Sequence, residues 1–185
     1  MKLKHVLYAS MLMLFFSPAF AQEVPAGFVI GSVTLADGSV VNGYIKDNLK
    51  KSASVQFIDS KGMKKSYTAS QVNGASIGDA KYTCISGDFF RTLSAGKMNF
   101  LQKASNASGS LTFNGSEAVA SSGTEGKVGD YFVFANNQLK LLTKKNLDSF
   151  ISNDLAVCAP AVEKAKSING DIARLQEAVD IFNNN

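Results

Sequence analysis

The chain has 185 residues, and its 19 basic and 15 acidic side chains give a formal net charge of +4. This length fits one domain with room for a small appendage. Two cysteines exclude a four-cysteine zinc site within one chain.

The first 21 residues are typical of a secretory signal peptide. Lys2 and Lys4 provide a positive start, an apolar run covers 6–16, and Ala19-Phe20-Ala21 matches a small-x-small cleavage site. The run of 11 residues is shorter than the roughly 18 that a membrane-spanning helix needs. We therefore expect a mature protein that begins at Gln22, is exported to the periplasm, envelope or medium, and has no integral membrane span.

Removal of residues 1–21 changes the chemistry available to the protein. It takes away His5, the only histidine, which excludes Ser-His-Asp and Cys-His nucleophiles and imidazole zinc sites. It also removes Lys2 and Lys4, so 17 basic residues remain against 15 acidic ones and the net charge is +2. We expect no nucleic-acid partner, because a net charge of +2 gives little affinity for phosphates. We also expect no cofactor.

Residues 22–143 are predicted to form an antiparallel β domain. Asp37-Gly38 lies between two β-branched runs and predicts a tight hairpin. A short helix over 88–94 is the alternative to a strand there. The predicted strands cover 28–35, 40–45, 54–58, 64–68, 75–77, 82–85, 89–93, 98–101, 131–135 and 139–142.

Residues 104–128 differ in composition, since Ser, Gly and Ala fill 14 of the 25 positions. This segment is predicted to be an exposed, flexible hairpin that turns at Asn114-Gly115.

Residues 144–185 are predicted to be a helical tail. Pro160 suits a first helical turn, and Asp171 can cap the last helix. That helix has an apolar stripe that packs on the sheet or, alternatively, enters a partner groove. The predicted fold class is α+β, mainly β: an antiparallel sheet or small barrel of hairpins followed by two or three C-terminal helices. The stripe consists of Ile172, Leu175, Val179 and Phe182.

Two resemblances accompany this prediction. The first pattern is Val33-x-Leu35-x-Asp37-Gly38 followed by Gly43-x-Ile45. With it, residues 27–78 resemble Sm-like small β-barrels, which implies a strongly bent sheet, although the Arg-Gly signature of RNA-binding members is absent. The whole chain, with its Cys158-Ala159-Pro160 helix entry, also resembles small uncharacterised secreted proteins of Gram-negative bacteria, and no activity follows from that resemblance.

Two pairs of residues are candidate sites. Ser94 and Lys97 match S-x-x-K, in which a lysine accepts the proton of a nucleophilic serine, and the alternative is a β-turn. Cys84 and Cys158 either form a disulfide in an oxidising compartment or remain two buried free thiols. A disulfide across so long a loop would contribute roughly 4 kcal/mol.

The lysine pairs at 50–51, 64–65 and 144–145 are predicted either to form one basic patch or to lie on solvated edges. The leading hypothesis is an exported, non-enzymatic binding or interaction protein whose partner is an unknown envelope protein or glycan. A serine-lysine hydrolase or acyltransferase at Ser94 and Lys97 is one alternative. A component of an envelope assembly, which docks through its hairpin or terminal helix, is another.

Overall fold

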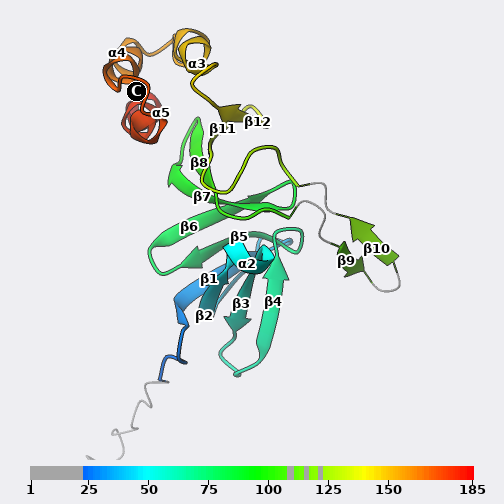
Figure 1. Cartoon of the computed structure of the whole chain (residues 1–185). Helices are drawn as coiled ribbons and strands as arrows, with labels where there is room; N and C mark the ends of the chain where they lie inside the picture. The colour runs from blue at the N-terminus through cyan, green and yellow to red at the C-terminus, as the bar shows by residue number, and fades with distance from the viewer. Residues whose placement is uncertain (1–22, 108–110, 115–116, 121–122) are drawn as a thin grey trace, which may run out of the picture.

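The computed structural model describes residues 23–107, 111–114, 117–120 and 123–185 (Figure 1). The predicted signal peptide and the Gly115 turn position lie outside these residues. Within the described part of the chain, no helix combines the length and apolar character needed to cross a bilayer.

Ten strands form one open antiparallel sheet built from two meanders. In the first meander each strand pairs with the next in sequence. In the second, β5 pairs with β1 rather than with β4, and the remaining strands follow in order. The first meander is β1 (Val29–Leu35), β2 (Val40–Asn48), β3 (Ser54–Ile58) and β4 (Lys64–Thr68). The second is β5 (Val72–Ile77), β6 (Ala80–Ile85), β7 (Asp88–Ser94), β8 (Asn99–Lys103), β11 (Tyr131–Ala135) and β12 (Gln138–Leu142).

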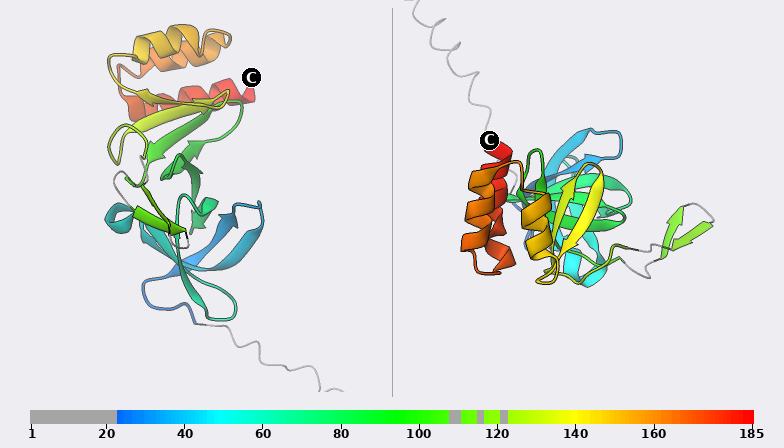
Figure 2. Two further views of the ribbon diagram at one scale, coloured as in Figure 1. Left: turned by 90° about the vertical axis from the view of Figure 1, so that its right-hand side faces the viewer. Right: turned by 90° about the horizontal axis from the view of Figure 1, so that it is seen from above.

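A short helix, α2 (Leu49–Ser52), connects β2 to β3, and the other helices follow β12. These pack together at one end of the sheet (Figure 2), where α5 contacts β7 and β8. Asp171 caps the last helical segment by accepting the Ala173 N–H at 3.1 Å, as predicted. The C-terminal helices are α3 (Leu147–Asn153), α4 (Ala159–Ser167), η1 (Ile172–Arg174) and α5 (Leu175–Asn184).

The predicted α+β, mainly β class is confirmed, and of the two architectures considered the open sheet is the one observed. Residues 88–94 form a strand rather than a helix. Successive side chains point to opposite faces of the sheet, and Phe89 and Phe90 are buried one on each face. Leu175 and Val179 of the terminal helix are fully buried in the protein's own core.

Two separate apolar clusters cover one face of the sheet. The N-terminal cluster lies where the two meanders meet and has Val33, Phe57 and Phe89 among its buried members. The helical cluster lies beneath the C-terminal helices and includes Phe100 and Phe150. Burial of large apolar side chains on this scale is the main stabilising contribution to such a fold.

Two glycines of the first meander allow close approach, Gly31 to β5 of the second meander and Gly43 to β3. Gly31 of β1 is opposite Gly43 of β2. A Cβ at Gly31 would lie 2.2 Å from the Ser76 carbonyl oxygen, and one at Gly43 would lie 2.2 Å from that of Ile58. Any other residue would therefore displace the backbone of a neighbouring strand.

The segment between β8 and β11 contains a hairpin that we call the arm, formed by β9 (Leu111–Asn114) and β10 (Glu117–Ala120). These strands pair with each other and form a sheet of their own. Figures 1 and 2 show the arm standing away from the rest of the molecule.

A fully buried ion pair holds the base of the arm. Lys103 Nζ lies 3.1 Å from Asp88 Oδ2, and neither side chain is exposed to solvent. The same ammonium donates to the carbonyl oxygens of Thr124, Glu125 and Gly126 at 2.7, 3.1 and 3.3 Å. We call this arrangement the Asp88–Lys103 clamp.

The carboxylate of Asp88 joins the two ends of the arm segment. It accepts the Ala107 N–H at 2.7 Å on the outgoing side, and the N–H and hydroxyl of Thr124 at 2.8 and 2.7 Å on the returning side. Burial by itself raises the pKa of Asp88, but these hydrogen bonds and the one from Lys103 outweigh it, so the pKa lies below its ordinary value. The carboxylate is therefore charged at neutral pH.

Replacing Lys103 by Met should reduce the free energy of unfolding by about 3–5 kcal/mol, because it leaves the buried Asp88 carboxylate without its cation. Urea unfolding of a chain of residues 22–185 measures the change. The matched control is Lys140→Met, whose ion pair with Asp154 is 41% and 33% exposed and should contribute less than about 1 kcal/mol. Equal losses for the two variants would contradict a special role for the clamp.

Candidate binding cavity

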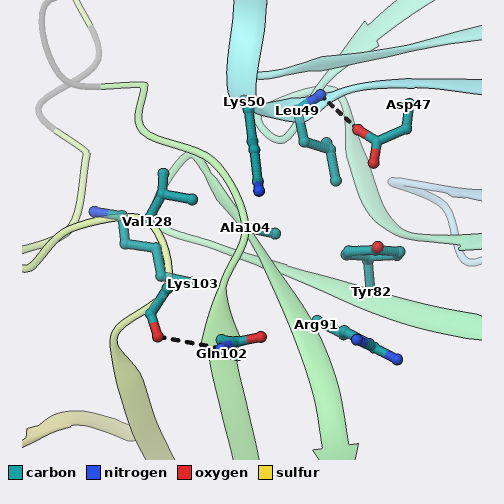
Figure 3. A pocket seen from close by; sticks show the side chains of 10 residues that line it. Asp47, Leu49, Lys50, Tyr82, Arg91, Gln102, Lys103, Ala104 and Val128 are labelled. Atoms are coloured by element: carbon teal, nitrogen blue, oxygen red, sulfur yellow. Dashed lines mark hydrogen bonds between the residues drawn. The ribbon is translucent and has the colours of Figure 1, made fainter.

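A cavity of about 340 Å³ lies between α2 and strands β6 to β8, where the first meander faces the second (Figure 3). It belongs to the sheet face that carries both apolar clusters, and it lies between them. The residues that line it are Asp47, Leu49, Lys50, Tyr82, Arg91, Gln102, Lys103, Ala104, Val128 and Gly129.

One wall is a polar row that crosses three adjacent strands. Tyr82 of β6 is directly opposite Arg91 of β7, and Arg91 is directly opposite Gln102 of β8. Side chains on directly opposite residues of an antiparallel pair share a face and lie close together. Val33 and Ala75, which are buried, are directly opposite each other on β1 and β5, and Ala75 is directly opposite Tyr82. The polar row therefore extends this buried line across β6, β7 and β8.

The opposite wall comes from α2 and from Asp47, which lies two residues before the helix begins. Asp47 Oδ1 accepts the Leu49 N–H at 2.8 Å, a local turn that leads into this one-turn helix. Leu49 is buried in the N-terminal cluster and anchors the helix there. In Figure 3, Lys50 and Asp47 consequently face Tyr82 and Arg91 across the cavity.

The returning end of the arm segment provides the third wall. The side-chain amide of Gln102 donates to the Gly129 carbonyl at 3.2 Å, and the Gly129 N–H donates to the Lys103 carbonyl at 2.8 Å. Val128 is 38% exposed and lines the cavity from this side. Lys103 contributes its backbone, because its ammonium is held in the clamp.

The charges of the cavity are unbalanced toward positive. Lys50 and Arg91 bring two cations, while Asp47 is the one acidic lining residue. Neither cation has an ion-pair partner among the residues that the structure describes. Burial and the nearby Asp47 raise the pKa of Tyr82, with Arg91 opposing them, so the phenol is neutral at physiological pH.

The structure places Ser94 away from this cavity. Ser94 is the last residue of β7, is buried, and accepts a hydrogen bond from Asn183 Nδ2 of α5 at 3.1 Å. The Asn183 side chain also bonds to the backbone N–H and carbonyl of Met98, which fixes the turn that contains the exposed Lys97. No hydrogen bond joins Ser94 and Lys97 in the described residues, so the geometry favours the turn, and the dyad stays a prediction.

Substitution of Ser94 by Ala should cost about 1 kcal/mol of unfolding free energy, because one hydrogen bond is lost while Asn183 keeps its bonds to Met98. A fluorophosphonate probe, which labels activated serines, should leave a wild-type chain of residues 22–185 unmodified. Labelling that disappears in Ser94→Ala but persists in the exposed-serine variant Ser152→Ala would instead establish the serine-lysine alternative.

Cys84 and Cys158 are both free thiols in the structure, where Cys84 is half-buried and Cys158 is buried. The disulfide between them stays a prediction. Cys84 lies on β6 against the N-terminal cluster, and burial raises the pKa of its thiol to about 12, while Cys158 is buried immediately before α4.

The three lysine pairs do not line a common cavity. Lys50 lines the one described above, Lys64 and Lys65 lie beside a hollow on the edge strand β4, and Lys144 lines another near η1. Within the described residues, no three His, Cys, Asp or Glu side chains gather as a metal site would require.

The sequence alone missed Arg91, Tyr82 and Asp47. Each lies in a strand pattern that gives it no distinguishing signal, and the three come together only because the two meanders pair. Comparisons with protein-family models, curated proteins and solved structures gave no match for this chain.

Proposed function

We propose that the mature chain is an exported, non-enzymatic binding protein of the cell envelope that takes its ligand in the cavity between α2 and β6 to β8. The observation that carries this proposal is the pair of cations, Lys50 and Arg91, which line one cavity with the neutral Tyr82 and have no ion-pair partner among the described residues. The signal-like sequence over 1–21 supports export.

The lining favours recognition over catalysis. Two of its polar side chains serve the local structure, since Asp47 accepts the N–H of the first residue of α2 and Gln102 donates to Gly129. The nucleophile considered from the sequence, Ser94, is buried beneath α5. A cavity with a few convergent polar groups on rigid strands is the usual form of a small-ligand site.

The proposal can be tested by a substitution at Val128 that fills the cavity. Val128→Trp should abolish ligand binding because the indole occupies the space between α2 and β8, whereas Val157→Trp should preserve it. Val157 is 85% exposed, does not line the cavity, and provides a matched control.

The measurement is backbone amide NMR of the ¹⁵N-labelled mature chain titrated with a solubilised envelope extract. We expect shifts at Tyr82, Ala104 and Gly129 in the wild type and in Val157→Trp, and their loss in Val128→Trp. An extract that shifts no amide of the cavity, or that shifts the same amides in both variants, would contradict the proposal.

A second candidate function, a component of an envelope assembly, is favoured by the arm. Its two strands pair with no strand of the main sheet in the described residues, and an isolated two-stranded hairpin is only marginally stable in water. The Asp88–Lys103 clamp nevertheless holds together the two chain segments, at Ala107 and Thr124, that lead to it. Such an element gains stability when a partner adds to one of its edges.

Replacing residues 111–120 by a Gly-Ser linker of equal length tests this candidate, because it removes the paired strands and keeps the clamp. The size of the crosslinked species formed by the exported protein in cells should fall to that of the isolated chain. The matched control is the Lys140→Met variant, which is treated with the same crosslinker. A crosslinked species of unchanged size in the arm variant would contradict the assembly role.

A further inference from the structure

We propose that the cavity binds an acidic sugar unit of an envelope polysaccharide, with its carboxylate between Arg91 and Lys50. This inference rests on the proposed binding function and names the ligand class for the same site. It follows from the charge, the hydrogen-bonding groups and the size of the cavity.

The charges fit a single carboxylate. Arg91 offers a planar fork of donors, a geometry that matches a carboxylate in a bidentate pair. Lys50 adds a point charge from the opposite wall. Asp47 reduces the net charge of the lining to one positive unit, which balances a monoanion, whereas a dianionic phosphate would be repelled by that carboxylate.

The remaining polar groups fit hydroxyls. Leu49 uses one carboxylate oxygen of Asp47, so the other is available to accept from a ligand hydroxyl. The neutral phenol of Tyr82 can both donate and accept. The side-chain carbonyl of Gln102 provides a further acceptor, because its amide nitrogen is the atom that bonds to Gly129.

The apolar part of the lining fits the face of a sugar ring. The Tyr82 ring, Leu49 and Val128 give the cavity a set of hydrophobic surfaces beside its polar groups. A purely apolar ligand would leave the polar groups unpaired, which is costly in a partly enclosed site.

Size limits the ligand to a short segment. About 340 Å³ lies at the lower end of the roughly 300–1,000 Å³ of small-molecule sites. We therefore expect one or two sugar units in the cavity, with the rest of the polysaccharide outside.

Isothermal titration of the mature chain with oligogalacturonate, compared with its methyl ester, tests the inference. The ester keeps the size and hydroxyls of the ligand and removes its charge. We expect the acid to bind at least tenfold more tightly than the ester, and Arg91→Gln to remove that preference. Lys65→Gln is the matched control, because Lys65 is an exposed lysine that lines a different hollow.

The outcomes separate this inference from the proposed function. Equal affinities for acid and ester, an unaffected Arg91→Gln variant, or equally tight binding of inorganic phosphate would overturn the acidic-sugar assignment. If envelope extract still shifts the cavity amides in that case, the binding function stands with another ligand. If neither extract nor acidic sugar reaches the cavity, both proposals fail.

Discussion

The pairing of β1 with β5 is the constraint on which the rest of the structure depends. Without it the two meanders would be separate sheets, each with an exposed apolar face and two open edges. The pairing requires β1 and β5 to approach closely, since a Cβ added at Gly31 would clash with the Ser76 carbonyl oxygen. It also brings α2 of the first meander over β6 to β8 of the second, so the cavity is a consequence of the junction.

The same junction explains why polar residues are tolerated in the middle of a sheet face. The N-terminal cluster lies on the sheet face at the junction, and the helices cover the far end. The N-terminal cluster reaches Tyr82 at one end of the polar row, while Arg91 is exposed and Gln102 is half-buried. Burying Arg91 beneath an additional apolar element would be unfavourable unless an anion paired with it.

Local sequence patterns predicted much of this fold because its connections are local. The hairpin at Asp37-Gly38 and the cap at Asp171 follow from short-range rules, and both occur where expected. The β1–β5 pairing could not be predicted, since no local signal states that β5 returns past β4. The cavity was missed for the same reason, because Asp47 and Arg91 meet only through that non-local pairing.

The Asp88–Lys103 clamp was missed for a different reason. Charged side chains in a sequence are ordinarily placed at the surface, because burying them unpaired is costly. Here Asp88 and Lys103 lie just outside the predicted strands 89–93 and 98–101, where no local signal distinguishes them. Only the folded chain shows that each has a buried partner, together with backbone groups of the arm segment.

Closing the arm segment at its base makes the outer part of the insertion modular. The hydrogen bonds from Ala107 and Thr124 to Asp88 hold the two ends of the arm segment together inside the protein. They offset the conformational entropy lost when β8 is joined to β11. Beyond those contacts, doubling the length of a flexible loop costs only about 0.6 kcal/mol. The region between residues 107 and 124 is thus a natural graft site, where a peptide of another length or sequence can be displayed while the main sheet is preserved.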